Sequence, residues 1–150
     1  MSTLPQIQIE QFPGAPDAFP IARMTAGASG FDICAAADAV IEPGAVAVIS
    51  TGIRLRMPHG IEAQIRSRSG LAAKYGVCVL NAPGTIDSDY DGELKVILLN
   101  TQPGPAFRIA RGDRVAQVVF ARVEPVQVTG LANDNALAVR GEGGLGSTGI

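Results

Sequence analysis

Hydrophobic and polar residues alternate along this chain in short runs that glycine and proline separate. Residues 61–65 alternate strictly, and residues 7–10 have the pattern of an edge strand. Residues 45–57 form a longer run that is broken at Thr51-Gly52. Side chains that alternate with a period of two, with turn residues between the runs, are typical of an all-β sandwich or barrel.

Three further segments complete the predicted set of strands and helices. Residues 93–100 and 114–123 are more continuously apolar, as strands buried on both faces would be, and residues 105–109 predict another strand. Only residues 69–75 have helical character; Ser67 or Ser69 could cap this helix, and Gly76 would end it. Because the sequence lacks a long amphipathic helix, it disfavours a βαβ parallel sheet.

The composition predicts one soluble domain. The chain has 150 residues, of which 47% are hydrophobic, and it contains no apolar stretch near the ~20 residues of a membrane span. Its first residues lack the pattern of a signal peptide, so we expect a cytoplasmic protein. In a cytoplasmic protein, we expect Cys34 and Cys78 to be buried free thiols. Since His59 is the only histidine, a catalytic triad or a histidine-based metal site is disfavoured.

The charge pattern limits the class of partner. The net charge is −2, lysine and arginine are scattered, and the chain has no tryptophan. This disfavours a nucleic-acid backbone as the main partner, but it leaves room for one small phosphate ligand.

Residues 81–93 read N-A-P-G-T-I-D-S-D-Y-D-G-E. The apolar runs on either side, residues 77–80 and 94–99, predict a hairpin, and Asp91-Gly92 suits its tight turn. Asp87 follows the constrained Pro83-Gly84, and Tyr90 lies close to it in the sequence. A fixed carboxylate beside a rigid aromatic ring suits a pocket for a polar small molecule. An acidic hairpin with a packing tyrosine is the alternative.

The C-terminal residues 140–149 contain five glycines in ten positions. Such a segment buries too little surface to offset its conformational entropy, so we expect residues 140–150 to be mobile until a ligand orders them over a barrel domain of residues 1–139. The glycine spacing G-x-G-x-x-G is not a dinucleotide fingerprint here, because no helix can follow it. Arg140, Ser147 and Thr148 still suit an anion. The alternative is a disordered end without a role.

Two other segments carry candidate chemistry. Residues 66–71 join a strand to the short helix, where Arg68 and Ser69 could bind an anion; ordinary capping is the alternative. Gly112-Asp113 suits a hairpin turn before Gln117, a polar residue within an apolar strand. A buried amide needs a partner, so Gln117 either pairs with the backbone or contacts a ligand.

A further acid lies near the N-terminus, in residues 28–33. Phe31 and Ile33 have the pattern of core residues, so Asp32 between them faces the opposite side. Alone, Asp32 reads more readily as a turn or structural acid than as a ligand.

Five segments, taken in order, resemble the five motifs of the homotrimeric dUTP diphosphatases (dUTPases). They are A-S-G-F-D-I at 28–33, R-S-R-S-G-L-A at 66–72, N-A-P-G-T-I-D-S-D-Y-D-G at 81–92, R-G-D-R-V-A-Q at 111–117 and R-G-E-G-G-L-G-S-T-G at 140–149. The resemblance spans nearly the whole chain. It implies a distorted jelly-roll β-barrel and a homotrimer in which each active site uses segments of all three subunits.

The resemblance also implies the activity. dUTP would be hydrolysed to dUMP and pyrophosphate by attack of water on the α-phosphorus, which limits uracil incorporation into DNA and supplies dUMP for thymidylate synthesis. The implied partners are dUTP and other copies of the chain, with no nucleic acid and no membrane. Mg²⁺ would bind the triphosphate, with Asp32 contacting the water molecules of the ion and no protein side chain as a direct ligand.

The residues of the implied site fall into groups. Asp87 would activate the attacking water, Tyr90 would pack against the deoxyribose, and Asn81 with the neighbouring backbone would pair with uracil and disfavour cytosine. Gly84, Thr85 and Ile86 complete the nucleoside pocket, and Lys95 is a further substrate-binding residue. The phosphate group comprises Arg68, Ser69, Gly70 and Gln117. The closing segment contributes Arg140, Gly144, Leu145, Gly146, Ser147 and Thr148.

Three residues depart from the pattern of the family. Ser67 stands where many members carry proline, which should loosen that loop slightly. Asp91 stands where arginine or glutamine is common, and a turn residue should be tolerated there. Leu145 stands where many members place a ring that stacks on uracil, a contact worth roughly 1 kcal/mol by analogy with aromatic pairs.

Two alternatives share this fold. A dCTP deaminase-related enzyme would need a glutamate near the cytosine amino group, whereas this chain has I-D-S-D-Y in the corresponding segment. A catalytically weak, nucleotide-binding regulatory module would not explain Asp87, Tyr90, Arg68 and Arg140 together.

Overall fold

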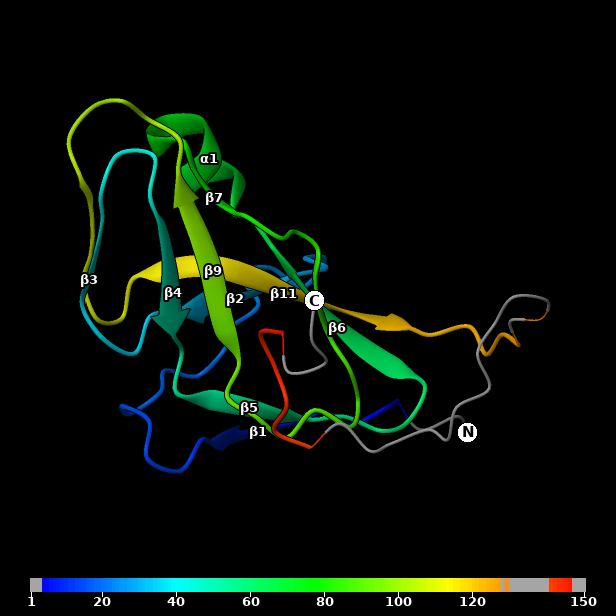
Figure 1. The fold of residues 1–150 in the computed structure, drawn as a ribbon. Helices are drawn as coiled ribbons and strands as arrows, with labels where there is room; N and C mark the ends of the chain where they lie inside the picture. The colour runs from blue at the N-terminus through cyan, green and yellow to red at the C-terminus, as the bar shows by residue number, and fades with distance from the viewer. Residues whose placement is uncertain (1–3, 128, 130–140, 147–150) are drawn as a thin grey trace.

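The computed structural model of the chain describes residues 4–127, 129 and 141–146. The described residues form strands and one short helix, as predicted (Figure 1). The elements are β1 (Gln8–Gln11), β2 (Phe31–Cys34), β3 (Ala39–Ile41), β4 (Val46–Ser50), β5 (Ile53–Arg56), β6 (Ile61–Arg66), α1 (Ser69–Tyr75), β7 (Val77–Val79), β8 (Gly84–Ile86), β9 (Lys95–Asn100), β10 (Phe107–Ile109) and β11 (Arg114–Arg122).

The strands form small antiparallel sheets around one core. One sheet has the order β2-β11-β6-β8 and another the order β4-β9-β7, while β1 pairs with β5 and β3 with β10. In Figure 1 the sheet of β4, β9 and β7 lies in front of β2, β11 and β6. This is the predicted jelly-roll-like β architecture. The edge strand and the interruption at Thr51-Gly52 are confirmed, since β5 is the only partner of β1 among the described strands and Gly52 has φ of 70°.

The core lies between the two larger sheets. Strand β6 buries Ile61, Ala63 and Ile65 on one face, and β9 buries Val96 and Leu98 opposite them. Each large aliphatic side chain that is fully buried in this way contributes about 1.5–3 kcal/mol to folding.

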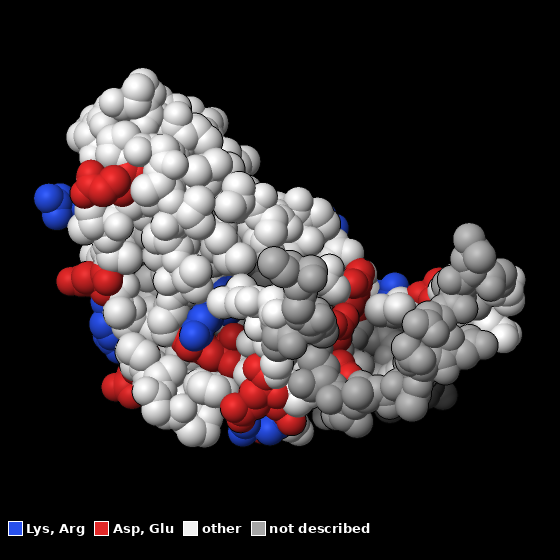
Figure 2. Space-filling view, in the orientation of Figure 1, with Lys and Arg blue, Asp and Glu red and all other residues white. Residues whose placement is uncertain are grey.

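The prediction that β9 is buried on both faces is wrong within one chain. Ile97 and Leu99 are only partly buried, and their cross-strand neighbours Val48 and Val46 in β4 are 52% and 50% exposed. Figure 2 shows that the surface over β4 and β9 carries few charged side chains except at its outer edge. An apolar sheet face is therefore uncovered in the single chain.

The short helix α1 ends as predicted but begins differently. Gly76 ends it with φ of 61°, which confirms its role. The N-cap is Arg68, without a side-chain hydrogen bond, so the prediction that Ser67 or Ser69 caps the helix is wrong. Instead, Ser67 Oγ accepts a hydrogen bond of 2.8 Å from the Val79 N–H. Ser67 thus ties the loop to β7, a contact that counters the loosening expected from the loss of proline.

The predicted hairpin is present, but its turn lies elsewhere. Strands β7 and β9 pair antiparallel, while β8 leaves the loop between them and pairs with β6. The Tyr90 N–H donates to the Asp87 carbonyl at 3.2 Å, so the turn spans residues 87–90 and not Asp91-Gly92. Gly92 is needed for another reason, since a Cβ there would lie 2.5 Å from Tyr90 Cζ.

The two cysteines are free thiols, as predicted, but they are only half-buried. Burial, followed by the nearby Asp32 carboxylate, raises the pKa of the Cys34 thiol. Cys34 therefore stays protonated and is a weak nucleophile near neutral pH. Within the part of the chain that the structure describes, no helix has the length and hydrophobicity needed to cross a bilayer.

We predict that Asn100→Ala lowers the free energy of unfolding by about 1–3 kcal/mol. Asn100 is 1% exposed, donates to the Ile41 carbonyl and accepts from the Gln102 N–H, both at 3.1 Å. The substitution leaves both backbone groups without this partner. Urea denaturation at a fixed chain concentration measures the change. Gln8→Ala, on an exposed strand, should stay within about 0.5 kcal/mol of the unaltered chain. An equally small loss for Asn100→Ala would contradict the prediction.

Candidate functional site

A cavity of about 270 Å³ lies between the loop of residues 80–94 and the C-terminal segment, residues 141–146. Eight predicted substrate-binding residues line it: Asn81, Gly84, Thr85, Ile86, Tyr90, Lys95, Gly144 and Leu145. Ile65, Glu93 and Ile97 complete the wall. The structure thus brings together eight residues that the resemblance assigns to substrate binding, and we call this space the tyrosine pocket.

Tyr90 is fixed at the wall of the tyrosine pocket. Its hydroxyl donates to the Glu93 carbonyl at 2.9 Å. The ring lies against two residues without side chains, since a Cβ on Gly144 would lie 3.1 Å from Tyr90 Oη and one on Gly92 would overlap the ring. Both positions therefore require glycine if the ring is to keep this place.

The C-terminal segment contacts the loop through its backbone. Tyr90 forms a parallel bridge with Gly141, and the Asp91 N–H donates to the Gly141 carbonyl at 2.7 Å. Leu145, with φ of 46°, lies at the mouth of the tyrosine pocket and is 65% exposed. Gly146 is outside the wall of the pocket, and the predicted residues Arg140, Ser147 and Thr148 lie outside the described residues.

Glu93 is a pocket residue that the sequence did not reveal. It is 9% exposed, accepts hydrogen bonds from Ser50 Oγ and from the Gly52 N–H at 2.9 Å, and lies 3.7 Å from Lys95 Nζ. In the sequence it reads only as the polar start of a strand. The available signal was a carboxylate directly before an apolar run. The groups that donate hydrogen bonds to this carboxylate, however, lie more than 40 residues away along the chain.

The second group of predicted residues gathers where β2 and β11 meet the start of α1. Asp32 accepts from Arg68 Nε at 3.3 Å and from Arg114 Nη1 at 3.1 Å, and Arg68 Nη1 donates to the Arg114 carbonyl at 3.0 Å. The Asp32 side chain is 13% exposed. We call these three residues the arginine cluster. Ser69 and Gly70 begin α1 directly after Arg68 and are exposed.

Gln117 lies beside the arginine cluster. It pairs with Asp32 in strand register, and its Nε2 donates to the Ser67 carbonyl at 2.9 Å. Of the two possibilities open from the sequence, the side chain therefore uses the backbone contact. Gly30 leaves the space for it, since a Cβ there would lie 3.2 Å from Gln117 Cδ.

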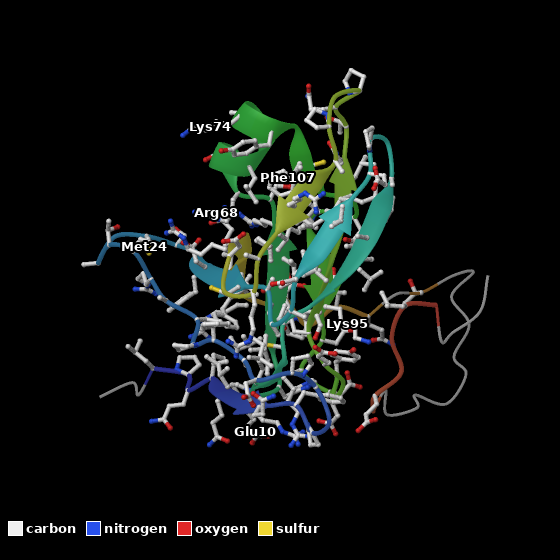
Figure 3. All side chains as sticks on the ribbon, turned by 90° about the vertical axis from the view of Figure 1, so that its left-hand side faces the viewer. Glu10, Met24, Arg68, Lys74, Lys95 and Phe107 are labelled. Carbon is white, nitrogen blue, oxygen red and sulfur yellow. The ribbon has the colours of Figure 1, made fainter. Side chains whose placement is uncertain are left out.

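The arginine cluster and the tyrosine pocket do not meet within one chain. Arg68 and Arg114 line a cavity of about 770 Å³ between α1 and β10, and none of the residues of the tyrosine pocket lines it. Figure 3 shows Arg68 below α1 and Lys95 apart from it, on the side of the C-terminal segment. Asp87 lines a third cavity of about 480 Å³, together with His59, Glu62 and Val126.

The described residues offer no ready-made cage for a metal ion. Among them, no group of three or more histidine, cysteine, aspartate or glutamate side chains is placed to hold one. Both oxygens of Asp32 accept from a guanidinium. This donor set does not fit direct coordination by the protein. It fits an ion that a ligand carries, because a carboxylate oxygen can accept further hydrogen bonds from water.

Comparison with known proteins identifies the family. A family model described as dUTPase matches residues 18–149. The deoxyuridine 5'-triphosphate nucleotidohydrolase of Anaplasma marginale is 54% identical over 127 residues, covering 83% of this chain and 85% of that protein. The protein of the same name from Wolinella succinogenes is 46% identical over 149 residues, covering 99% of both chains.

Solved structures agree at the level of the fold. The Streptococcus mutans dUTPase has a TM-score of 0.75 and 27% identity, covering 80% of this chain and 98% of that one. A mutant dUTPase of the Staphylococcus aureus phage phi11, described as coordinating a structural Mg(II) ion, has a TM-score of 0.76 and 22% identity, covering 87% and 99%. Together with the family match over most of its length, these relatives show that the chain belongs to the dUTPase family.

Proposed function

We propose that this protein is a dUTP diphosphatase, which hydrolyses dUTP to dUMP and pyrophosphate. The observation that carries the proposal is the tyrosine pocket, where Tyr90, Asn81 and the backbone of β8 meet the C-terminal segment in a chain of this family. Relatives over nearly the whole chain are named deoxyuridine 5'-triphosphate nucleotidohydrolases. The reaction removes dUTP before it enters DNA and supplies dUMP for thymidylate synthesis.

The tyrosine pocket selects the base and the sugar. The Asn81 amide and the backbone of Gly84–Ile86 supply donors and acceptors for the uracil edge, and a bound cytosine would desolvate some of these groups and leave them unpaired. Gly84 keeps the approach open, since a Cβ there would lie 3.1 Å from Asn81 Nδ2. The Tyr90 ring, held by Glu93, packs against the deoxyribose and leaves no room for a 2'-hydroxyl.

The phosphates bind at Arg68, Ser69, Gly70 and Gln117, whose Nε2 has a second N–H besides the one bonded to the Ser67 carbonyl. Two donors of the Arg68 guanidinium bind Asp32 and the Arg114 carbonyl, and these contacts fix the direction of the remaining donors. The exposed N–H groups at Ser69 and Gly70 add donors for an anion. Arg140, Gly144, Leu145, Gly146, Ser147 and Thr148 close over the nucleotide from the C-terminal segment.

Mg²⁺ is the cofactor. Bound to the triphosphate, it would neutralise the phosphate charge and favour one triphosphate conformer. Asp32 would accept hydrogen bonds from water molecules around the ion. The two guanidinium partners of Asp32 orient its carboxylate for this contact.

Asp87 performs the chemical step as a general base. Its carboxylate holds a water molecule and accepts a proton from it as the water attacks the α-phosphorus in line. The turn of residues 87–90 and the backbone bond between Tyr90 and Asp87 hold the backbone of Asp87 in the same loop as Tyr90, which supports this role.

A complete site needs more than one subunit, and we propose a homotrimer with shared active sites. Within one chain, Arg68 and Arg114 line one cavity, the tyrosine pocket is a second, and Asp87 lines a third. The uncovered apolar face at Val46, Val48, Ile97 and Leu99 supports an interface with another copy, because contiguous apolar surface of this kind mostly marks contacts. Two free thiols suit a reducing cytoplasm, where we place the enzyme.

The substrate test is release of pyrophosphate in the presence of Mg²⁺ from dUTP, dCTP, dTTP and UTP. We expect turnover of dUTP alone, and loss of that turnover in a chain that ends at Val139. Light scattering should give both proteins the mass of three chains, which excludes misassembly as the cause. Ammonia release from dCTP would indicate the deaminase instead, and no turnover by an intact trimer would indicate a binding protein.

Asp87→Asn should lower kcat by about 10²–10⁴-fold, because the amide cannot accept the proton. The affinity for dUTP should change little, since the amide occupies the same volume. Rapid-quench measurement of single turnovers isolates the chemical step. Asp89→Asn, two residues later in the same turn, serves as the matched control. Equal effects of the two substitutions would remove Asp87 from the mechanism.

Leu145→Phe should raise kcat/KM for dUTP by about fivefold, the equivalent of the roughly 1 kcal/mol of a face-to-face ring contact. Leu145 lies at the mouth of the tyrosine pocket, where a ring can cover the base. Leu145→Met, which is apolar but not flat, should show no such gain. An unchanged kcat/KM for the phenylalanine variant would mean that leucine already supplies the full contact.

A further inference from the structure

The docking edge for the C-terminal segment is the backbone of Tyr90 and Asp91. Gly141 bridges to Tyr90, and the Asp91 N–H donates to the Gly141 carbonyl at 2.7 Å. Three residues further along, Gly144 lies against the Tyr90 ring and, with Leu145, closes the tyrosine pocket. The direction in which the Asp91 N–H points therefore sets where the segment enters the pocket.

An ion pair from another part of the fold holds this docking edge. Arg56 Nη1 in β5 pairs with Asp91 Oδ1, and Arg56 Nε lies 3.4 Å from Glu10 Oε2 in β1. Hydrogen bonds from Arg54 and Arg56 lower the pKa of Glu10, so Glu10 stays charged near neutral pH. Figure 2 shows charges of both signs gathered at the lower edge of the molecule, in the region of β1 and β5.

Arg54 provides an internal comparison. It lies on the same strand and pairs with the same Glu10 oxygen at 2.7 Å, and no contact joins it to Asp91 in the described chain. Removing Arg54 therefore disturbs the β1–β5 charges and leaves the Asp91 pair in place. Removing Arg56 removes both the Asp91 pair and the Arg56 contact with Glu10. The two arginines separate a general effect on this edge of the fold from a specific effect on the docking edge.

We propose that Arg56 and Asp91 are positioning residues that set the affinity of the docking edge for the C-terminal segment. The carboxylate, held by Arg56, orients the Asp91 N–H toward Gly141, and the effect is the same whichever subunit supplies the segment. The consequence for nucleotide binding rests on the proposed function, whereas the docking itself does not. The aspartate that departs from the family pattern thus has a specific partner in this chain.

The test that needs no nucleotide is limited trypsin digestion. Trypsin cleaves after Arg140, and docking of Gly141 slows this cleavage; mass spectrometry follows release of residues 141–150. Arg56→Met and Asp91→Asn should each speed the release about two- to fivefold, as expected for a half-exposed ion pair, and Arg54→Met should not. The double variant should be no faster than either single variant, because both remove the same contact.

The second arm measures KM for dUTP. Arg56→Met and Asp91→Asn should raise it about two- to fivefold, with Arg54→Met unchanged. Unchanged trypsin release in Arg56→Met and Asp91→Asn, or equal acceleration in all three single variants, would overturn the proposal. If the unaltered chain turned over no dUTP, the proposed function would fail, and the digestion result would still decide the role of Arg56 and Asp91.

Discussion

One buried carboxylate, Glu93, organises the part of the fold that carries the tyrosine pocket. Its Oε1 accepts from Ser50 Oγ and from the Gly52 N–H, and its main-chain carbonyl accepts from the Tyr90 hydroxyl. One residue further, the Leu94 carbonyl accepts from Thr51 Oγ1. A buried charge is costly unless it is fully paired, so the break between β4 and β5 and the start of β9 must stay together. Tyr90 takes its position from this fixed point.

The glycines around Tyr90 follow from the same constraint. With the hydroxyl held by Glu93, the hydroxyl end of the ring lies against Gly92 and Gly144, and a side chain at either position would displace it. Gly92 belongs to the loop and Gly144 to the C-terminal segment. The position of the Tyr90 ring therefore determines both the shape of the pocket wall and the closure of the pocket by the C-terminal segment. A substitution at either glycine alters both.

Much of the local structure could be predicted from the sequence, because local rules decide it. The break at Thr51-Gly52 and the end of α1 at Gly76 both need a positive φ, which glycine supplies. The sequence predicts the turn of residues 81–93 at Asp91-Gly92, which has the preferred turn composition. Gly92 is instead required by its contact with the Tyr90 ring. The prediction that Ser67 caps α1 is wrong for a similar reason, since the Ser67 hydroxyl accepts a hydrogen bond from the Val79 N–H in β7. Contacts between distant segments decide these positions, and no local pattern encodes them.

The misjudged burial of β9 points to the assembly. A continuous apolar run predicts burial on both faces, yet only Val96 and Leu98 are covered within the chain, and Ile97 and Leu99 face outward beside exposed valines of β4. An isolated chain gains nothing from apolar residues on that face, and they favour aggregation. The same chain divides its arginine cluster and its tyrosine pocket between separate cavities. The homotrimer with shared active sites that we propose would account for both facts.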